Sequence, residues 1–388
     1  MLTEHFHNNL KGLGPYPDNL ISVLNLENAK AAFDEIKTWQ GYASTPLRSL
    51  DKIAAEIGVK NIYYKDESSR FGIGSFKALG GTYGVLKFIH HELQLEIGGQ
   101  LSIADIHQGK YSTQISNYTV TTATDGNHGR AVAFGAKLFG CKCEIYIHAE
   151  VSKGRQKAME VLGANVVRIS GNYDESLRIC VAEASKNNWH VISDTSFEGY
   201  TKYPRYIMAG YNVMAEEIVQ QLHELPLPTH IFLQGGVGSF PGAICGYFWE
   251  KFPEKDIKVV VVESEHAPCL IRSAQNNQMT SVNIKQETMM AGLSCGEPSL
   301  LGWKILKSGT DDFITINDSS IPELMRVLAI NNPKIEAGES SVAGLAGLIE
   351  SMKDQKISET MGLNDESVVL LFGTEGATDP EIYHSIVS

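Results

Sequence analysis

The sequence predicts an α/β protein with mostly parallel sheets, and three observations lead to that prediction. Between residues 117 and 194, short apolar segments alternate with amphipathic segments of helical length, a pattern typical of βαβ units. Later segments such as KVVVVES at Lys258–Ser264 are apolar almost throughout, which suits strands that are covered on both faces. Glycine-rich turns follow four of the expected strands. These features predict two open, twisted sheets flanked by helices.

The expected elements follow one another along the chain. A helix is expected over 46–57, with a strand in NIYYKDES behind it. In the middle of the chain we expect strands at 117–124, 143–149, 165–170 and 190–194, and helices at 130–139, 154–162 and 173–187. The pattern restarts with a helix at 206–222 and with strands that begin near Thr229, Lys258 and Ser367. The segment 94–116 is rich in Gly, Gln and Ser and is interpreted as a surface loop.

Length and charge limit the classes of function. The 388 residues correspond to about two or three domains at roughly 100–200 residues each. No long polar linker separates the halves, so we expect a larger domain of residues 1–88 and 205–388 with a smaller α/β domain, 89–204, inserted in it. The chain has 33 Lys+Arg against 45 Asp+Glu, a net charge of −12. This acidic balance argues against nucleic acid as a partner.

The compartment is predicted from what the sequence lacks. The N-terminus has no apolar signal region, and no segment approaches the ~18 apolar residues that span a bilayer. We therefore expect a cytoplasmic chain without a membrane partner. The six cysteines show no zinc-ligand spacing, so no metal is expected. Whether Cys269 and Cys295 form a disulfide stays open.

The first glycine-rich segment, KDESSRFGIGSFKALGG at 65–81, places Lys77 near the start of an expected helix. A helix N-terminus favours anions, so a charged lysine is electrostatically out of place there. The position suits a lysine that is neutral or covalently bound, as in a Schiff base. The alternative is a solvated surface lysine, because exposure is the rule for this residue type.

Three further segments offer backbone amides at strand ends. In TATDGNHGRAVA, at 122–133, a helix start can bind a carboxylate, although an ordinary helix cap explains it as well. In QGGVGSFPGA, at 234–243, a glycine-rich loop can hold a phosphate, although a plain strand–helix turn explains it as well. FGTEGATD, at 372–379, ends the last expected strand. Ligands of open α/β sheets bind at the carboxyl ends of the strands. One lysine, one loop for a phosphate and one for a carboxylate together indicate an aldehyde-phosphate cofactor with an amino-acid substrate.

The segments SFKALGG, DGNHGRAVA, GGVGS and GTEG occur in the order and at the spacing of fold-type II pyridoxal-phosphate enzymes. Nearly the whole chain resembles this superfamily, which includes threonine dehydratase and the tryptophan synthase β chain. DTSFEGYTKYP and TMMAGLSCGEPSLLGWKIL more specifically resemble the diaminopropionate ammonia-lyase family. The resemblance implies pyridoxal 5′-phosphate as cofactor, bound by the larger domain, and a homodimer.

The resemblance also implies roles for particular residues. Lys77 would carry the cofactor as a Schiff base, with Phe76 in the same site. Asn127 would donate a hydrogen bond to the cofactor 3′-oxygen, and Thr374 would face the pyridine nitrogen. A neutral hydroxyl at that nitrogen favours β-elimination. The phosphate would be held by Gly235, Gly236, Val237, Gly238 and Ser239.

The substrate carboxylate would be bound by Thr124, Gly126 and His128. Asp125 departs from the wider superfamily, which typically has serine at that place. A carboxylate beside a carboxylate site costs electrostatic energy, but it makes sense as a base or as a partner for a second substrate amine. Asp194, in SDTSFEGY, would be interpreted as a helix cap without the resemblance. In the family, Asp125 and Asp194 look like substrate-binding α-proton bases on opposite faces of the substrate.

The expected activity is therefore that of a carbon–nitrogen lyase. It would convert D- and L-2,3-diaminopropionate to pyruvate and two ammonia by α,β-elimination. The alternative is a serine/threonine dehydratase, or a related β-elimination or β-replacement enzyme on the same fold. A third interpretation is a non-catalytic protein that binds the cofactor. The presence of both candidate carboxylates, Asp125 and Asp194, argues against it.

Overall fold

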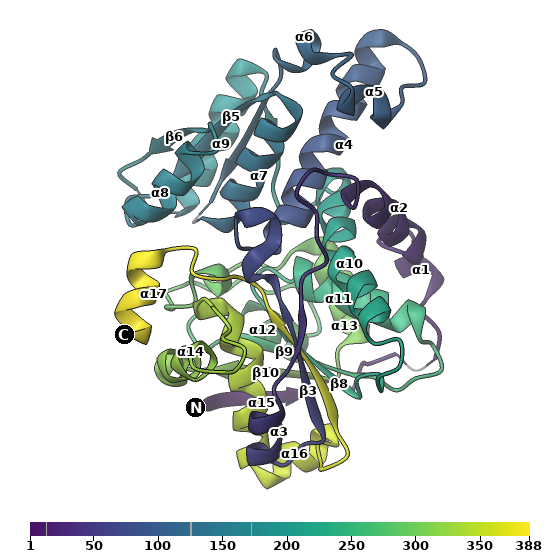
Figure 1. Ribbon diagram of the computed structural model, residues 1–388, viewed down its shortest axis with the longest axis vertical. Coiled ribbons are helices and arrows are strands. Elements are labelled where there is room, and N and C mark those ends of the chain that lie inside the picture. The colour runs from purple at the N-terminus through teal and green to yellow at the C-terminus, as the bar shows by residue number, and fades with distance from the viewer. Residues whose placement is uncertain (13, 125, 172) are drawn as a thin grey trace.

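The computed structural model describes residues 1–12, 14–124, 126–171 and 173–388, and it contains two sheets flanked by helices (Figure 1). The larger sheet has the strand order β1-β10-β9-β8-β11-β3-β2, and the smaller sheet has the order β6-β5-β4-β7. The larger sheet consists of β1 (Leu2–His7), β2 (Leu47–Ser49), β3 (Asn61–Asp66), β8 (His230–Gln234), β9 (Lys258–Ser264), β10 (Asp312–Ile316) and β11 (Val368–Gly373). The smaller sheet consists of β4 (Thr119–Ala123), β5 (Lys142–Ile147), β6 (Asn165–Arg168) and β7 (His190–Val191). The expected mostly parallel α/β class is confirmed.

The helices cover both sheets. Those in the first half of the chain are α1 (Asp18–Ile21), α2 (Leu26–Ile36), α3 (Asp51–Ile57), α4 (Lys77–Ile97), α5 (Ile103–His107), α6 (Ser112–Ile115), α7 (Asn127–Phe139), α8 (Lys153–Glu160) and α9 (Tyr173–Asn187). Those in the second half are α10 (Lys202–Gln221), α11 (Ser239–Lys251), α12 (Cys269–Gln275), α13 (Leu300–Gly309), α14 (Ile321–Ala329), α15 (Ala343–Lys353), α16 (Gln355–Met361) and α17 (Pro380–Val387). Short 3₁₀ turns are η1 (Glu67–Gly72), η2 (Ala291–Leu293), η3 (Asp318–Ser320) and η4 (Glu339–Val342).

The central strands of the larger sheet are buried on both faces. In β11, Leu370 and Phe372 pack into one core with α4, α10 and α11, while Val369 and Leu371 pack into a second core with α14, α15 and α16. Successive side chains of a strand point to opposite faces. This double burial explains why the strand sequence is apolar without alternation.

The two sheets occupy different parts of the chain. The strands of the smaller sheet lie between residues 119 and 191, and those of the larger sheet lie outside that range. The helix α4 runs from Lys77 to Ile97 and crosses the expected domain boundary at residue 88. The boundaries given above stay a prediction.

Several local expectations were wrong. The segment 46–57 begins with β2, which pairs antiparallel with β3, before α3 starts at Asp51. The segment 94–116 contains the end of α4 and the short helices α5 and α6, so it is not one loop. The strands β1 and β10 were not expected, because their pairing joins residues about 300 positions apart, such as Phe6 and Phe313. Local pattern does not show such pairing.

The described part of the chain was also searched for membrane-crossing helices. None of its helices combines the length and the apolar composition that a bilayer crossing requires.

Candidate active site

The expected site residues lie where strands of both sheets end. Lys77, Asn127 and Ser239 are the first residues of α4, α7 and α11. Thr374 follows directly after β11, and its carbonyl accepts a hydrogen bond from the backbone N–H of Phe76 at 3.1 Å. Parallel strands therefore bring these residues to one edge, the usual place for ligands in open α/β sheets.

Lys77 forms an ion pair with Asp194. Its Nζ atom donates a hydrogen bond to Oδ2 of Asp194, and the two side chains are 20% and 19% exposed. Burial works against the charge of Lys77, but the Asp194 carboxylate outweighs it and the pKa of Lys77 is raised. Burial likewise opposes the charge on Asp194. The His128 ring, which is protonated only in acid, and the Lys77 ammonium hold the pKa of Asp194 below its usual range. Both groups are therefore charged at neutral pH.

His128 is the third member of this group. Its Nε2 atom lies 2.8 Å from the carbonyl oxygen of Ile192, which can only accept, so Nε2 carries the proton. Its Nδ1 atom lies 3.8 Å from Oδ2 of Asp194 and has no hydrogen-bond partner among the described residues. Burial lowers the pKa of His128. The ring is therefore neutral at neutral pH and presents a bare nitrogen toward the Lys77–Asp194 pair.

The loop after β4 forms a tight turn around Thr124. The Oγ1 atom of Thr124 accepts hydrogen bonds from the backbone N–H groups of Gly126 at 3.1 Å and Gly129 at 3.2 Å. A Cβ atom on Gly129 would lie 2.4 Å from Cγ2 of Thr124, so the turn has no room for a side chain there. Asp125, the expected second base, lies outside the described residues.

The loop after β8 has the geometry of an anion site. Gly236 and Gly238 have φ values of +56° and +96°, which favour glycine. The N–H groups of Gly236 and Val237 make no hydrogen bond to another described residue. Ser239 opens the 13-residue helix α11, whose first N–H groups have no intrahelical partner. These amides fit a phosphate.

Two further contacts connect the expected residues. The Oγ atom of Ser239 donates a hydrogen bond to the carbonyl oxygen of Asp194 at 2.6 Å, which joins the phosphate loop to the Lys77–Asp194 pair. The Oγ1 atom of Thr374 lies 3.5 Å from Oγ of Ser341. The side chain of Thr374 is buried at the end of β11.

Asn127 contacts a carboxylate that was not expected from the sequence. Its Nδ2 atom donates to Oε2 of Glu375, whose Oε1 atom accepts from the N–H of Ser340 at 3.1 Å. Burial and the nearby Glu375 raise the pKa of Glu339 to about 6. Glu375 directly follows the predicted site residue Thr374 in the GTEG turn. That adjacency was the one sequence signal that could have placed Glu375 in the site.

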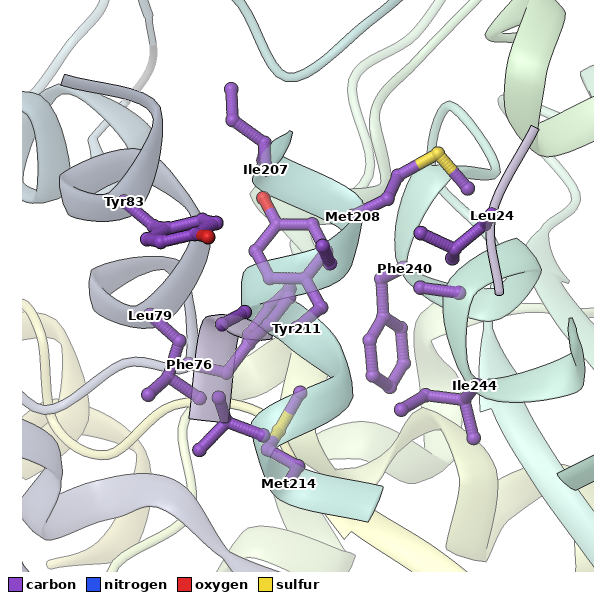
Figure 2. Close-up of a cluster of buried hydrophobic side chains, with 14 of the residues drawn as sticks. Leu24, Phe76, Leu79, Tyr83, Ile207, Met208, Tyr211, Met214, Phe240 and Ile244 are labelled. Carbon is purple, nitrogen blue, oxygen red and sulfur yellow. The ribbon is translucent and has the colours of Figure 1, made fainter. Parts of the chain in front are cut away.

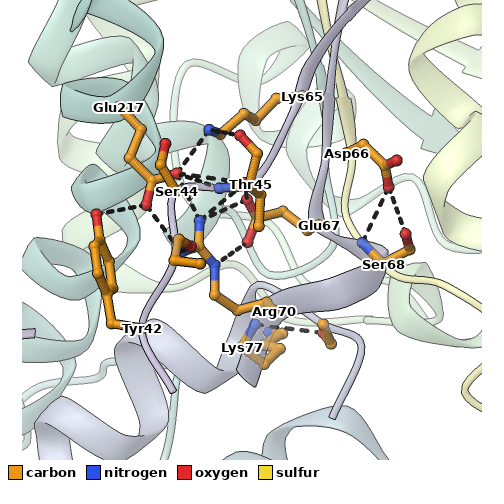
Figure 3. Close-up of polar contacts among 12 residues, drawn as sticks. Tyr42, Ser44, Thr45, Lys65, Asp66, Glu67, Ser68, Arg70, Lys77 and Glu217 are labelled. Atoms are coloured by element: carbon orange, nitrogen blue, oxygen red, sulfur yellow. Dashed lines mark hydrogen bonds and ion pairs between the residues drawn. The ribbon is translucent and has the colours of Figure 1, made fainter. Parts of the chain in front are cut away.

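A network of buried charges lies in the segment that leads to Lys77 and on α10 (Figure 3). Arg70 donates to both carboxylate oxygens of Glu67, at 2.8 and 2.9 Å, and to both of Glu217, at 2.8 Å each. Lys65 Nζ lies 2.6 Å from Oε2 of Glu217. Two positive and two negative side chains thus join β3 and η1 to α10. Because η1 leads into α4, the network supports the segment that carries Lys77.

The site fits a pyridoxal phosphate group by its own chemistry. It combines a partly buried lysine amine, backbone amides without a partner among the described residues, which suit a phosphate, and a buried hydroxyl after β11. The His128 Nδ1 atom and the Tyr211 hydroxyl, both buried next to Lys77, lack hydrogen-bond partners among the described residues. Unpaired polar atoms in such a place point to a ligand.

The fold and this site define the class of protein. The model of the family "Pyridoxal-phosphate dependent enzyme" matches residues 38–373, and the chain belongs to that family. It is 38% identical over 380 residues to a diaminopropionate ammonia-lyase of Salmonella typhimurium strain LT2, with 94% of each chain covered. It superposes with a TM-score of 0.88 on the Escherichia coli diaminopropionate ammonia-lyase in complex with an aminoacrylate-PLP azomethine reaction intermediate. That match has 35% identity and covers 100% of this chain and 97% of the other.

A more distant relative is a protein of Oenococcus oeni named "Probable D-serine dehydratase". It is 24% identical over 367 residues, which cover 91% of this chain and 81% of the relative. The expected fold-type II class and its cofactor are thereby confirmed.

Proposed function

We propose that this chain eliminates ammonia from D- and L-2,3-diaminopropionate. One substrate and one water give pyruvate and two ammonia. The observation that carries the proposal is the Lys77–Asp194 ion pair at the start of α4, in a chain 38% identical to a diaminopropionate ammonia-lyase. A neighbouring acid and base are what an elimination requires, because one proton leaves Cα and another must reach the leaving nitrogen.

Bound pyridoxal phosphate supplies an electron sink that acidifies the Cα–H bond of an amino acid. The ionised Asp194 carboxylate can accept the Cα proton on its side of the substrate. Lys77 Nζ holds a proton beside Asp194 and can deliver it to the leaving β-nitrogen. Each such proton transfer typically contributes ~10²–10⁴-fold to the rate.

The remaining residues bind and orient. The amides of Gly236, Val237 and Ser239 would hold the phosphate, and the turn around Thr124 would bind the substrate carboxylate. Neutral His128 offers an acceptor for an ammonium group. Asp125, which lies outside the described residues, would serve the opposite face of the substrate, so that one site accepts both isomers.

The lysine assignment is tested by Lys77→Ala. This variant should lose pyruvate formation and the visible absorbance of the bound cofactor. Lys87→Ala is the matched control, because Lys87 lies in the same helix but packs over the rings of Tyr83 and Tyr206. Intact visible absorbance in Lys77→Ala would overturn the assignment.

A serine dehydratase is the alternative that a specific observation favours, because a relative named as a D-serine dehydratase covers 91% of this chain. Steady-state assays with D- and L-diaminopropionate, D- and L-serine and L-threonine distinguish the two. A value of kcat/KM that is highest for a serine isomer would favour the alternative.

We further propose a cytoplasmic homodimer, as the family resemblance implies. Cys141, Cys143, Cys180, Cys245 and Cys269 are free thiols, which suits a reducing compartment. Light scattering that gives the mass of a single 42.5 kDa chain would contradict the dimer.

A further inference from the structure

Tyr211 lies directly beside the amine of Lys77. Its ring centroid is 5.7 Å from Lys77 Nζ, and the ring packs 4.8 Å from that of Phe76 (Figure 2). The side chain is fully buried, and its hydroxyl makes no hydrogen bond of good geometry to a described residue. It nevertheless lies close enough to Lys77 for that lysine to act on its pKa, lowering it against the larger effect of burial. Burying a hydroxyl without a partner costs free energy. A phenylalanine would fill the same space without that cost.

Two glycines make room for this phenol. A Cβ atom on Gly80 would lie 2.4 Å from Cε1 of Tyr211, and one on Gly210 would lie 2.8 Å from Cα of Gly80. The helices α4 and α10 therefore approach each other closely at this point. Gly80 belongs to the SFKALGG segment that begins one helical turn earlier. Its lack of a side chain is explained by the positions of Tyr211 and of the Ile207 carbonyl oxygen, which a Cβ atom would meet at 2.4 and 2.6 Å.

The other groups that face Lys77 come from different elements. Asp194 follows β7, His128 lies in the first turn of α7, and Cys295 lies in the loop before α13. An ionised carboxylate accepts hydrogen bonds only, so Asp194 binds the ammonium form of Lys77 well and the neutral amine poorly. A hydroxyl both donates and accepts. Tyr211 is thus suited to both forms of the amine.

We propose that the Tyr211 hydroxyl positions the free amine of Lys77 in both of its protonation states. It accepts a hydrogen bond from the ammonium and donates one to the neutral amine. Tyr211 is thereby a positioning residue, and the inference rests on the proposed function of Lys77 as cofactor-binding lysine and acid. Burial raises the pKa of Tyr211, so the phenol keeps its proton.

The variant Tyr211→Phe removes the hydroxyl and keeps the ring. Its kcat with diaminopropionate should fall about tenfold, the effect of losing one hydrogen bond to a charged group, while KM stays within about twofold. The rate at which the cofactor-stripped protein binds added pyridoxal phosphate, followed by absorbance, should fall by a similar factor. Both steps use the free amine of Lys77.

Tyr247→Phe is the matched control. Tyr247 lies in α11, is 1% exposed, and also has a hydroxyl without a partner among the described residues. It should leave both rates unchanged. Equal losses in the two variants, or no loss in Tyr211→Phe, would overturn the proposal.

A second variant keeps the proposal testable if Tyr211→Phe does not fold. Gly80→Ala would meet both the Tyr211 ring at 2.4 Å and the backbone carbonyl oxygen of Ile207 at 2.6 Å, whereas Gly84→Ala in the same helix meets Ile207 alone among these, at 2.9 Å. Only Gly80→Ala should slow cofactor binding, and equal rates in the two would overturn the proposal. If the wild-type protein forms no pyruvate, the proposed function fails, but the rate of cofactor binding still decides the role of Tyr211.

Discussion

The ring of Phe76 packs against the ring of Phe240, with 4.8 Å between their centroids. Phe76 precedes Lys77 in the chain and Phe240 follows Ser239, so one aromatic contact joins the start of α4 to the start of α11 (Figure 2). Phe240 also packs 5.3 Å from Phe372 of β11. Close packing resists displacement. The contact therefore holds the lysine and the phosphate loop at a fixed separation.

Phe240→Leu should weaken cofactor binding, because it loosens this contact while keeping an apolar side chain. Phe248→Leu is its control, since Phe248 is also buried in α11 but packs against Tyr247 and Phe252. Both variants should lose about 1–2 kcal/mol of unfolding free energy. A fluorescence titration with pyridoxal phosphate should show a raised Kd for Phe240→Leu alone. Equal Kd values in the two variants would show that the contact between Phe76 and Phe240 does not contribute to cofactor binding.

His128 should remain a neutral ring with its proton on Nε2 across the physiological pH range. Burial lowers its pKa from the ordinary 6.5. Because the folded pKa lies below the unfolded one, its contribution to stability is complete above about pH 6.5 and is lost as the pH falls through the folded value. Nitrogen-15 NMR of the histidine rings measures the tautomer directly. A doubly protonated His128 ring at pH 7 would contradict this assignment.

Glu217→Gln should destabilise the protein strongly, because it leaves Lys65 and Arg70 buried with too little negative charge. These side chains are at most 1% exposed, and breaking a buried ion pair typically costs about 3–5 kcal/mol. Glu366→Gln, which removes the exposed partner of Lys60, should leave the unfolding free energy unchanged. Urea unfolding of both variants checks the contrast. Similar midpoints would show that the buried network contributes little.

Asp194→Asn and Asp125→Asn should each lose one enantiomer of diaminopropionate. An amide keeps the shape of the side chain but cannot accept the Cα proton, so a loss of ~10²–10⁴-fold is expected on one face. Pyruvate release from each pure isomer measures the selectivity. If each variant loses both isomers equally, the two carboxylates have shared structural roles instead.

The buried strands were predicted well from the sequence, because a strand that is covered on both faces is apolar almost throughout. The strand at Lys258–Ser264 and the helix over 173–187 have the expected bounds. The helix expected over 206–222 begins earlier, at Lys202, because Pro204 is tolerated in a first helical turn. The pairing of β1 with β10 depends on distant contacts, which no local pattern encodes.

Some residues of the candidate site could likewise be predicted from the sequence, and others could not. Lys77 and the glycine-rich loops could be proposed because they stand at strand ends in recognisable segments. Tyr211 lies within a long helix with no motif around it, and its place beside Lys77 arises from the packing of α10 on α4. The contact of Glu375 with Asn127 likewise arises from tertiary structure. The lack of a side chain at Gly80 was the one sequence signal for Tyr211.

The central claim is tested most directly by a pyruvate assay with each pure enantiomer of diaminopropionate, with and without added pyridoxal phosphate. The account predicts pyruvate and two equivalents of ammonia from both isomers, dependent on the cofactor and absent in Lys77→Ala. If protein that has bound its cofactor forms no pyruvate from one of the isomers, or from both, the result contradicts the account.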